Sequence, residues 1–140
     1  MHEMTASEAR SRFFDVSDAA VLHQPTRITR RRADPVVVLS ERDLGVALSR
    51  FGFSPEVFRE NGNVSIWLPE LGVWGRGANL SEAKDDLLDE IDQILELFER
   101  DERFRTAPNV EPQLGWIMRL GMLETDQDRL EAVFAPPPNC

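Results

Sequence analysis

The order of elements predicted by residues 6–44 constrains the fold more than any other feature of this chain. The segment reads ASEARSRFFDVSDAAVLHQPTRITRRRADPVVVLSERDL. Residues 7–22 favour a helix, because Ser7 can cap its N-terminus and apolar residues recur three and four positions apart. The apolar face of this helix is expected to consist of Ala9, Phe13, Val16 and Ala20.

Two strands and a second helix are expected to follow within the same segment. Residues 26–30 alternate and are rich in β-branched side chains, which is typical of a strand. After a basic turn at 31–35, the apolar run 36–39 indicates a strand buried on both faces. Ser40 then precedes a helix that we expect to continue through Phe51. The segment therefore predicts a small αββα unit.

The second half of the chain has a different pattern. Residues 53–63 form a connector, where we place a domain boundary, and residues 64–68 and 73–77 predict a hairpin around a turn at 69–72. A long amphipathic helix is expected over 80–104, with an acidic outer face. Residues 114–123 predict a short, very apolar helix, and the proline-rich end at 135–140 is expected to be disordered. The whole chain therefore belongs to the α+β class.

Charge is distributed unevenly along the chain. The formal net charge is −9 over 140 residues, but residues 1–50 hold eight arginines and seven acids, a net of +1. Residues 51–140 hold eight bases and eighteen acids, a net of −10. The first part could tolerate a phosphate backbone, and the second would repel one and attract a basic protein. Alternatively, the acidic surface serves only solubility.

The sequence favours a non-catalytic, cytoplasmic protein. No apolar stretch is long enough to span a membrane, no signal peptide is recognisable, and the single cysteine, Cys140, cannot form an intrachain disulfide. His23 is the only internal histidine and lies in a turn, so neither a catalytic triad nor a metal site is expected. We expect no cofactor. A magnesium nuclease that uses the acids of the long helix is a weaker alternative.

Six arginines are the candidate contacts to nucleic acid. Guanidinium groups bind phosphate oxygens in pairs of hydrogen bonds and reach guanine edges in the major groove. In a compact αββα unit these side chains could converge on one face, although a solvated basic turn paired with nearby acids is an equal alternative. The candidates are Arg10, Arg12, Arg27, Arg30, Arg31 and Arg32.

The N-terminal residues resemble the prevent-host-death (Phd/YefM) antitoxins. The matching pieces are SEAR at 7–10, ITRR at 28–31, PVVVLS at 35–40 and ERDL at 41–44, in the same order and without a gap. The resemblance implies a dimeric DNA-binding module that recognises the operator of its own operon. It also implies DNA contacts by Arg10 and Arg30.

After Phe51 the chain departs from that family. Residues 64–95, VSIWLPELGVWGRGANLSEAKDDLLDEIDQIL, look like the core of HicB-type antitoxins. The resemblance implies a platform for protein binding or dimerisation. We therefore predict a Phd/YefM-like module at 1–52, a HicB-like hairpin and acidic helix at 53–105, and an apolar segment with a tail at 106–140.

Together these features predict a type II antitoxin of a toxin–antitoxin system. The homodimer would act as a repressor that binds operator DNA, which is transcription autoregulation, and would neutralise an RNA-targeting toxin by direct binding. A stand-alone dimeric regulator without a toxin partner is the alternative. The apolar helix could instead belong to the core, but it and the acidic helix supply the predicted toxin contacts: Asp85, Asp86, Asp89, Glu90, Trp116, Met118 and Met122.

Overall fold

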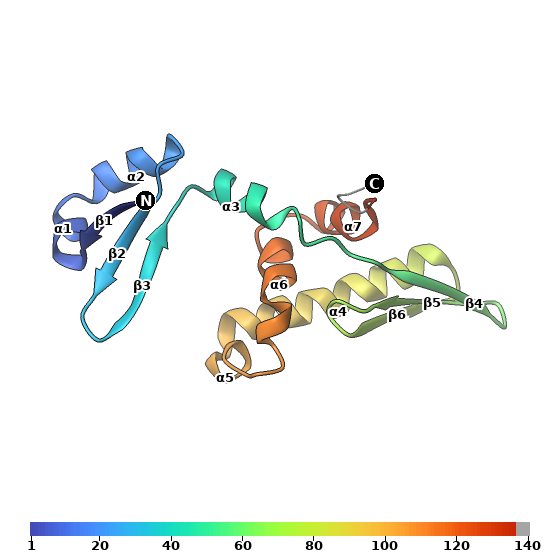
Figure 1. Cartoon of the computed structure of the whole chain (residues 1–140). Coiled ribbons are helices and arrows are strands. Elements are labelled where there is room, and N and C mark those ends of the chain that lie inside the picture. Colours follow the sequence, from blue (N-terminus) through green and yellow to red (C-terminus); the bar gives the residue numbers. More distant parts are fainter. Residues whose placement is uncertain (137–140) are drawn as a thin grey trace. The chain divides into compact units, whose positions relative to one another are not determined.

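The computed structural model describes residues 1–136 and divides into two compact units, Met1–Ala47 and Leu48 onward (Figure 1). Over the described residues the fold is mixed α+β, with two three-stranded sheets and seven α-helices. Most of the tail predicted to be disordered, residues 137–140, lies outside the described part. None of the described helices is long and apolar enough to cross a membrane.

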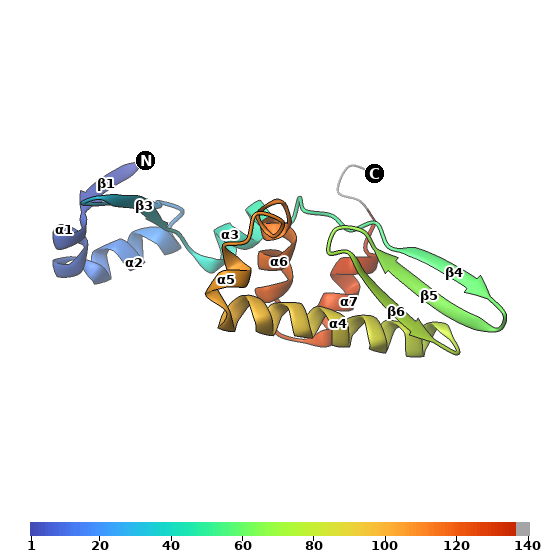
Figure 2. The ribbon, with the colours of Figure 1, turned by 90° about the horizontal axis from the view of Figure 1, so that it is seen from below.

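The first unit is a three-stranded sheet with two helices on one face (Figure 2). The strand order is β1-β2-β3; β1 is parallel to β2, and β3 is antiparallel to β2. A third helix follows and reaches the start of the second unit. The elements are β1 (His2–Thr5), α1 (Ala6–Ser11), α2 (Phe13–Val21), β2 (Thr26–Arg30), β3 (Ala33–Val38) and α3 (Glu41–Leu48).

The start of this unit differs from the prediction. The sequence did not predict β1, and the single helix expected over 7–22 is two helices separated at Arg12. The N-cap is Thr5 and not Ser7, because the Thr5 hydroxyl accepts a hydrogen bond from the Glu8 amide at 3.2 Å. The Glu8 carboxylate in turn accepts one from the Thr5 amide at 3.3 Å, which completes a capping box.

The core of the first unit is smaller than the sequence predicted. Met4, Ala9 and Val16 are buried, and Ile28 and Val38 pack against them. Phe13 was expected on the buried face of the helix but is 63% exposed. The prediction that residues 36–39 are buried on both faces was also wrong, because β3 is an edge strand and Val36 and Val37 are each 43% exposed.

The second unit combines an antiparallel sheet with four helices and a short 3-10 helix. The strand order is β4-β5-β6. The long helix α4 packs along β6 and β5. The elements are β4 (Glu56–Glu60), β5 (Asn63–Leu68), β6 (Val73–Gly77), α4 (Leu80–Arg100), α5 (Glu102–Arg105), η1 (Glu111–Gln113), α6 (Leu114–Gly121) and α7 (Asp126–Phe134).

The hairpin at β5 and β6 is confirmed, but the connector predicted at 53–63 contains the strand β4. Asn61 and Gly62 join β4 to β5, both with positive φ (53° and 78°), as a two-residue hairpin turn requires. The long helix ends at Arg100 and not at residue 104, because Asp101 is extended and caps α5. Helix α7 was not predicted, and α3 ends at Leu48, three residues before Phe51.

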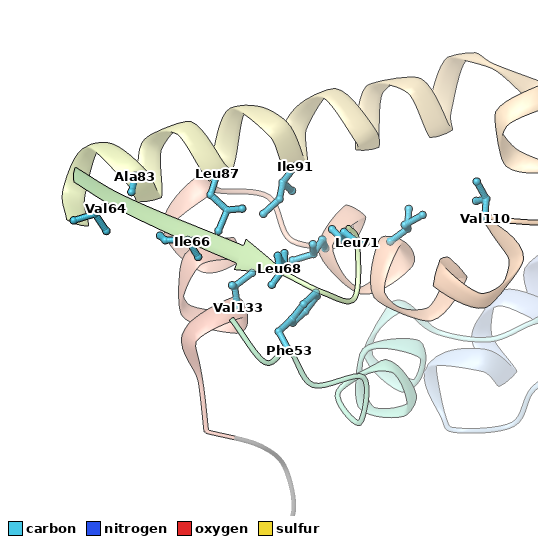
Figure 3. Close-up of a cluster of buried hydrophobic side chains, with 12 residues drawn as sticks. Phe53, Val64, Ile66, Leu68, Leu71, Ala83, Leu87, Ile91, Val110 and Val133 are labelled. Carbon is cyan, nitrogen blue, oxygen red and sulfur yellow. The ribbon is translucent and has the colours of Figure 1, made fainter. Parts of the chain in front are cut away.

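The core of the second unit lies between the sheet and the helices (Figure 3). Ile66 and Leu68 of β5 are fully buried, as are Leu87 and Ile91 of α4, and Val133 of α7 also lies in this cluster. Helix α4 approaches β6 closely because Gly75 has no side chain: a Cβ there would overlap the backbone of Ala83 and Leu87. The cluster also includes Ile117 and Leu120, so α6 contributes to the core, as one of the two interpretations of 114–123 expected.

Candidate functional site

One end of the first unit gathers part of the predicted arginine set. Strand β1 is parallel to β2, so Thr5 at its end lies opposite Thr29. Helix α1, which carries Arg10, therefore begins at the same end of the sheet as the β2–β3 turn, which consists of Arg31 and Arg32 (Figure 1). All three arginines are exposed, and none forms an ion pair with any residue of the range 1–136. We call Arg10, Arg31 and Arg32 the basic end.

Arg30 has a structural contact at this turn. Its guanidinium donates two hydrogen bonds to the Asp34 carbonyl oxygen, at 3.2 and 3.1 Å. The strand register shifts next to this residue, as expected of a β-bulge, and Pro35 has no amide hydrogen with which to continue the ladder. Arg30 therefore holds the bulge in place and keeps only its remaining N–H groups for a ligand.

The other two arginines lie elsewhere in the unit. Arg27 is on the sheet face opposite α1 and α2, where it pairs with Glu3 at 3.2 Å. Arg12 pairs with Asp15 at 3.4 Å and lines a small hollow near the start of β1. The structure therefore does not bring all six arginines to one face, as the sequence had suggested.

The predicted toxin contacts on α4 have two different environments. Asp85 and Asp89 are exposed, one helical turn apart, and Glu90 is partly exposed. The Asp86 carboxylate instead accepts a hydrogen bond from the Arg76 amide at 2.7 Å, which fastens α4 to the outer edge of β6. Asp86 is therefore engaged within the fold.

Trp116 is also engaged within the fold. Its indole N–H donates a hydrogen bond to the Gly52 carbonyl oxygen at 2.8 Å, and its ring contacts Phe51 edge to face with 5.1 Å between centroids. Arg119, one turn later, donates to the Phe51 carbonyl oxygen at 2.7 Å. Burial lowers the pKa of the Arg119 guanidinium. Together α6 and residues 51–52 form a fixed contact.

Met118 and Met122 come together at a groove between α4 and α6. The groove has a volume of about 720 Å³, and its floor includes Leu95, Phe98 and Ile117. Met118 is 41% exposed. Asp89 and Phe98 are nine residues apart on one helix, about 13 Å. The methionines and the pair Asp85 and Asp89 are therefore separate patches.

Arg129 closes one side of this groove and pairs with Asp92 at 3.2 Å and with Asp126 at 3.4 Å. Burial raises the pKa of the Asp92 carboxyl, and the negative charge of Asp126 raises it further. The positive charge of Arg129 lowers the pKa of Asp92, but by less than burial and Asp126 raise it. The ion pair with Arg129 therefore does not fully offset the free-energy cost of a charged carboxylate at position 92.

Among residues 1–136, no group of three or more potential metal ligands comes together, and the contacts of His23 are structural. His23 has a positive φ of 66°, and its Nδ1 lies 2.6 Å from an Asp43 carboxylate oxygen. This contact ties the end of α2 to α3. The pair is therefore a structural link within the first unit.

Sequence reasoning missed the exposed strand β4 and assigned Phe98 only to the stripe that faces the core. The signal for β4 was Asn61-Gly62, which is typical of a hairpin when strand-forming residues flank it. The residues EVFRE before it were instead assigned to a connector because Pro55 precedes them.

Comparison with known proteins identifies the family. Residues 1–135 match the family model PHD-like, described as "Antitoxin of toxin-antitoxin, RelE / RelB, TA system". A solved structure of an antitoxin part of a candidate toxin/antitoxin system from Syntrophomonas wolfei subsp. wolfei is 18% identical, with a TM-score of 0.82 over 97% of this chain and 99% of that chain. At this identity the similarity shows a shared fold alone. No curated protein matches the sequence. The family match covers nearly the whole chain, which therefore belongs to the PHD-like antitoxins of RelE/RelB toxin–antitoxin systems.

Proposed function

We propose that this antitoxin is of type II and divides two activities between its units. The first unit, as a homodimer, binds operator DNA and represses transcription of its own operon. The second unit neutralises an RNA-targeting toxin by direct binding. Because the operator lies in the cytoplasm, this function would be cytoplasmic. The Phd/YefM-like and HicB-like resemblances of the two parts support the same division.

The observation that carries the proposal is the separation of charge between the two units. Met1–Ala47 holds seven arginines and seven acids, so it is neutral overall, whereas the rest of the chain holds nine bases and eighteen acids. All of the net charge of −9 therefore belongs to the second unit. An acidic surface is attracted to a toxin that uses basic residues to hold RNA, and complementary charge speeds encounter.

The basic end supports DNA binding by the first unit. Arg10, Arg31 and Arg32 are exposed at one end of the sheet and have no acid paired with them within the described chain. Their guanidinium groups are free to bind phosphates or base edges. Arg30 adds its remaining donors next to the turn, whereas Arg12 and Arg27 would first have to leave Asp15 and Glu3.

The exposed apolar side chains of α2 and of its C-cap residue, Leu22, support a homodimer. Phe13, Phe14, Val21 and Leu22 are 63%, 80%, 70% and 78% exposed. A unit this small, with few buried apolar side chains, buries a limited fraction of its surface. A second copy that covers these side chains would add the apolar burial that the unit lacks.

Toxin binding by the second unit is supported by two patches. Asp85 and Asp89 offer exposed carboxylates on α4, with Glu90 beside them, and Met118 and Met122 offer an apolar groove that a helix of a partner could fill. Asp86 and Trp116 already have partners inside the unit, so we assign them to positioning α4 and α6.

The test is growth of cells that express the gene adjacent to this one, with and without this chain. We expect toxicity that the chain relieves, and a reporter under the operator that the chain represses. The combined variant Arg10→Ala, Arg31→Ala and Arg32→Asn should lose repression of the reporter and still neutralise the toxin. Asp85→Lys with Asp89→Lys should do the reverse. A harmless neighbour would favour a stand-alone regulator.

A further inference from the structure

The outer edge of β4 is an unpaired strand edge. Strand β4 (Glu56–Glu60) pairs with β5 on one side only, and no other strand among the described residues pairs with its second side (Figure 2). All five residues are exposed. A free edge presents a row of backbone N–H and C=O groups that can hydrogen-bond to a strand of another chain.

The opposite edge of the same sheet is protected. The Arg76 amide on β6 donates to the Asp86 carboxylate at 2.7 Å, and the Ala78 amide just after β6 donates to the Glu82 carboxylate at 2.8 Å. Both acids come from α4, which covers this edge. Within residues 1–136, no side chain hydrogen-bonds to the backbone of β4 in this way. The sheet is therefore open on one edge only.

The side chains of β4 alternate in a pattern suited to recognition. Glu56, Phe58 and Glu60 pair across the ladder with Trp67, Ser65 and Asn63, so they lie on the sheet face turned away from α4. Phe58 is 47% exposed and lies 5.9 Å from Trp74, whose ring is 4.9 Å from that of Trp67. On this face, β4 therefore presents an acidic, an aromatic and an acidic side chain in turn. The aromatic one, Phe58, belongs to a cluster with Trp67 and Trp74.

A second copy of the chain fits this edge poorly. In a two-fold antiparallel pair, paired side chains lie on the same face of the sheet only when one residue lies directly opposite its own copy. The axis then lies at that residue. An axis at Phe58 would set Glu56 opposite Glu60 of the second copy, and like charges directly opposite are destabilising. An axis at Arg59 would set two arginines opposite each other. An axis at Val57 would set Glu56 against an aromatic ring.

We infer that β4 is the docking edge for a cationic strand of the toxin, an assignment that rests on the proposed function. The partner strand pairs antiparallel with β4 and places a basic, an apolar and a basic side chain opposite Glu56, Phe58 and Glu60. Backbone hydrogen bonds supply the attachment, and the two carboxylates select the register and the sign of charge. The acidic surface of the whole unit favours the same partner.

The first test uses the full chain and a fluorescently labelled peptide, Thr-Arg-Thr-Leu-Thr-Arg-Thr, with Thr-Glu-Thr-Leu-Thr-Glu-Thr as its charge-reversed control. The basic peptide should bind the natural chain, and Glu56→Lys with Glu60→Lys should weaken that binding about tenfold and admit the acidic peptide. The matched control, Glu111→Lys with Glu124→Lys, makes the same charge change at exposed positions outside β4. Equal binding of both peptides, no binding of either, or equal weakening in the control variant would overturn the assignment.

The second test separates this assignment from the proposed function. The full chain is mixed with the product of the adjacent gene, the complex is isolated by size exclusion, and amide hydrogen exchange is compared with the free chain. Slower exchange across 56–60 is the expected result. A complex in which 56–60 exchange as in the free chain would overturn docking at β4 and leave toxin binding intact. Failure to form any complex would overturn both.

Discussion

At the scale of single residues, Gly115 shows how the second unit begins. The segment Phe51–Phe53 passes over α6, where Trp116 and Arg119 hydrogen-bond to the carbonyl oxygens of Gly52 and Phe51. The ring of Phe51 occupies the space that a Cβ on Gly115 would need. The absence of a side chain at this position therefore allows the contact between α6 and the start of the unit.

Gly115→Ala should destabilise the second unit by about 1–3 kcal/mol, because the added methyl group overlaps the Phe51 ring and the surroundings must shift. Urea unfolding followed by tryptophan fluorescence measures the change. Gly121→Ala on the same helix is the matched control, since its nearest neighbour, Leu95, would lie 3.8 Å away. If the two variants are equally stable, the close contact between Gly115 and Phe51 does not contribute to the stability of the unit.

Asp92 gives a second prediction at this scale. Its pKa is raised above the ordinary value of 3.8, mainly by burial. Because the pKa of Asp92 is raised in the folded state, its stabilising contribution is fully present at pH values below the ordinary pKa. That contribution is lost as the pH rises through the folded-state pKa. At neutral pH the charged carboxylate therefore opposes folding slightly.

Asp92→Asn should raise the free energy of unfolding at pH 7 relative to the natural chain and give no such gain near pH 3. The gain should stay below about 1 kcal/mol, because the side chain is 44% exposed and solvent screens its charge. Urea unfolding at both pH values measures it, with Asp85→Asn as the exposed control on the same helix. A decrease in stability at pH 7 would show that the pair with Arg129 dominates.

At the scale of elements, the turn between β2 and β3 concentrates charge at one end of the first unit. Arg32 has a positive φ of 57°, so its replacement should be asparagine, which tolerates this conformation better than alanine. Arg31→Ala with Arg32→Asn should weaken operator binding and lower the slope of log affinity against log salt by about 0.9 for each phosphate that the variant no longer neutralises. Arg100→Ala with Arg103→Ala in the second unit should leave both unchanged. An unaltered salt slope in the turn variant would remove these arginines from the interface.

The sequence predicted elements where periodicity and caps were strong. The hairpin β5–β6, the helix α4 and the start of α3 at Ser40 were found, because alternation, an amphipathic stripe and a capping serine are local signals. The strand β1 was missed because its four residues, HEMT, show no clear alternation, and its pairing partner β2 lies more than twenty residues away. The exposure of Phe13 could not be foreseen, because the break at Arg12 turns α2 relative to α1.

The sequence predicted which residue types form the candidate sites, but it predicted only part of their positions in the fold. The sequence indicated Met118 and Met122 together, and they share one groove. It could not show that Trp116 hydrogen-bonds to Gly52, since that contact joins segments 64 residues apart. The contact of Asp86 with the Arg76 amide joins two consecutive elements, but it depends on how α4 packs against β6 and periodicity does not reveal that packing. The same holds for the separation of Arg27 and Arg12 from the basic end.

At the scale of the whole molecule, the two units differ in how much apolar surface they bury. Among the residues that the structure describes, the first unit has four buried apolar residues, whereas the second has fourteen. The first unit also exposes the apolar side of α2. If this side is covered by a second copy, the stability of the first unit depends on protein concentration and that of the second does not.

This difference can be measured on the full chain. All three tryptophans, Trp67, Trp74 and Trp116, lie in the second unit and the chain has no tyrosine. Tryptophan fluorescence therefore reports the second unit, and far-UV circular dichroism reports both. The first unit should unfold at lower urea, with a midpoint that rises with protein concentration. Phe14→Asp should abolish the concentration dependence, and a midpoint independent of concentration in the natural chain would argue against the dimer.

The division of two activities between two units is tested most directly by amide hydrogen exchange of the full chain with each partner in turn. With operator DNA, slower exchange should be confined to residues 1–47 and be largest around α1 and the β2–β3 turn. With the product of the adjacent gene, it should be confined to residues 48–136. Protection of the same unit by both partners, or of neither unit by DNA, would contradict this account.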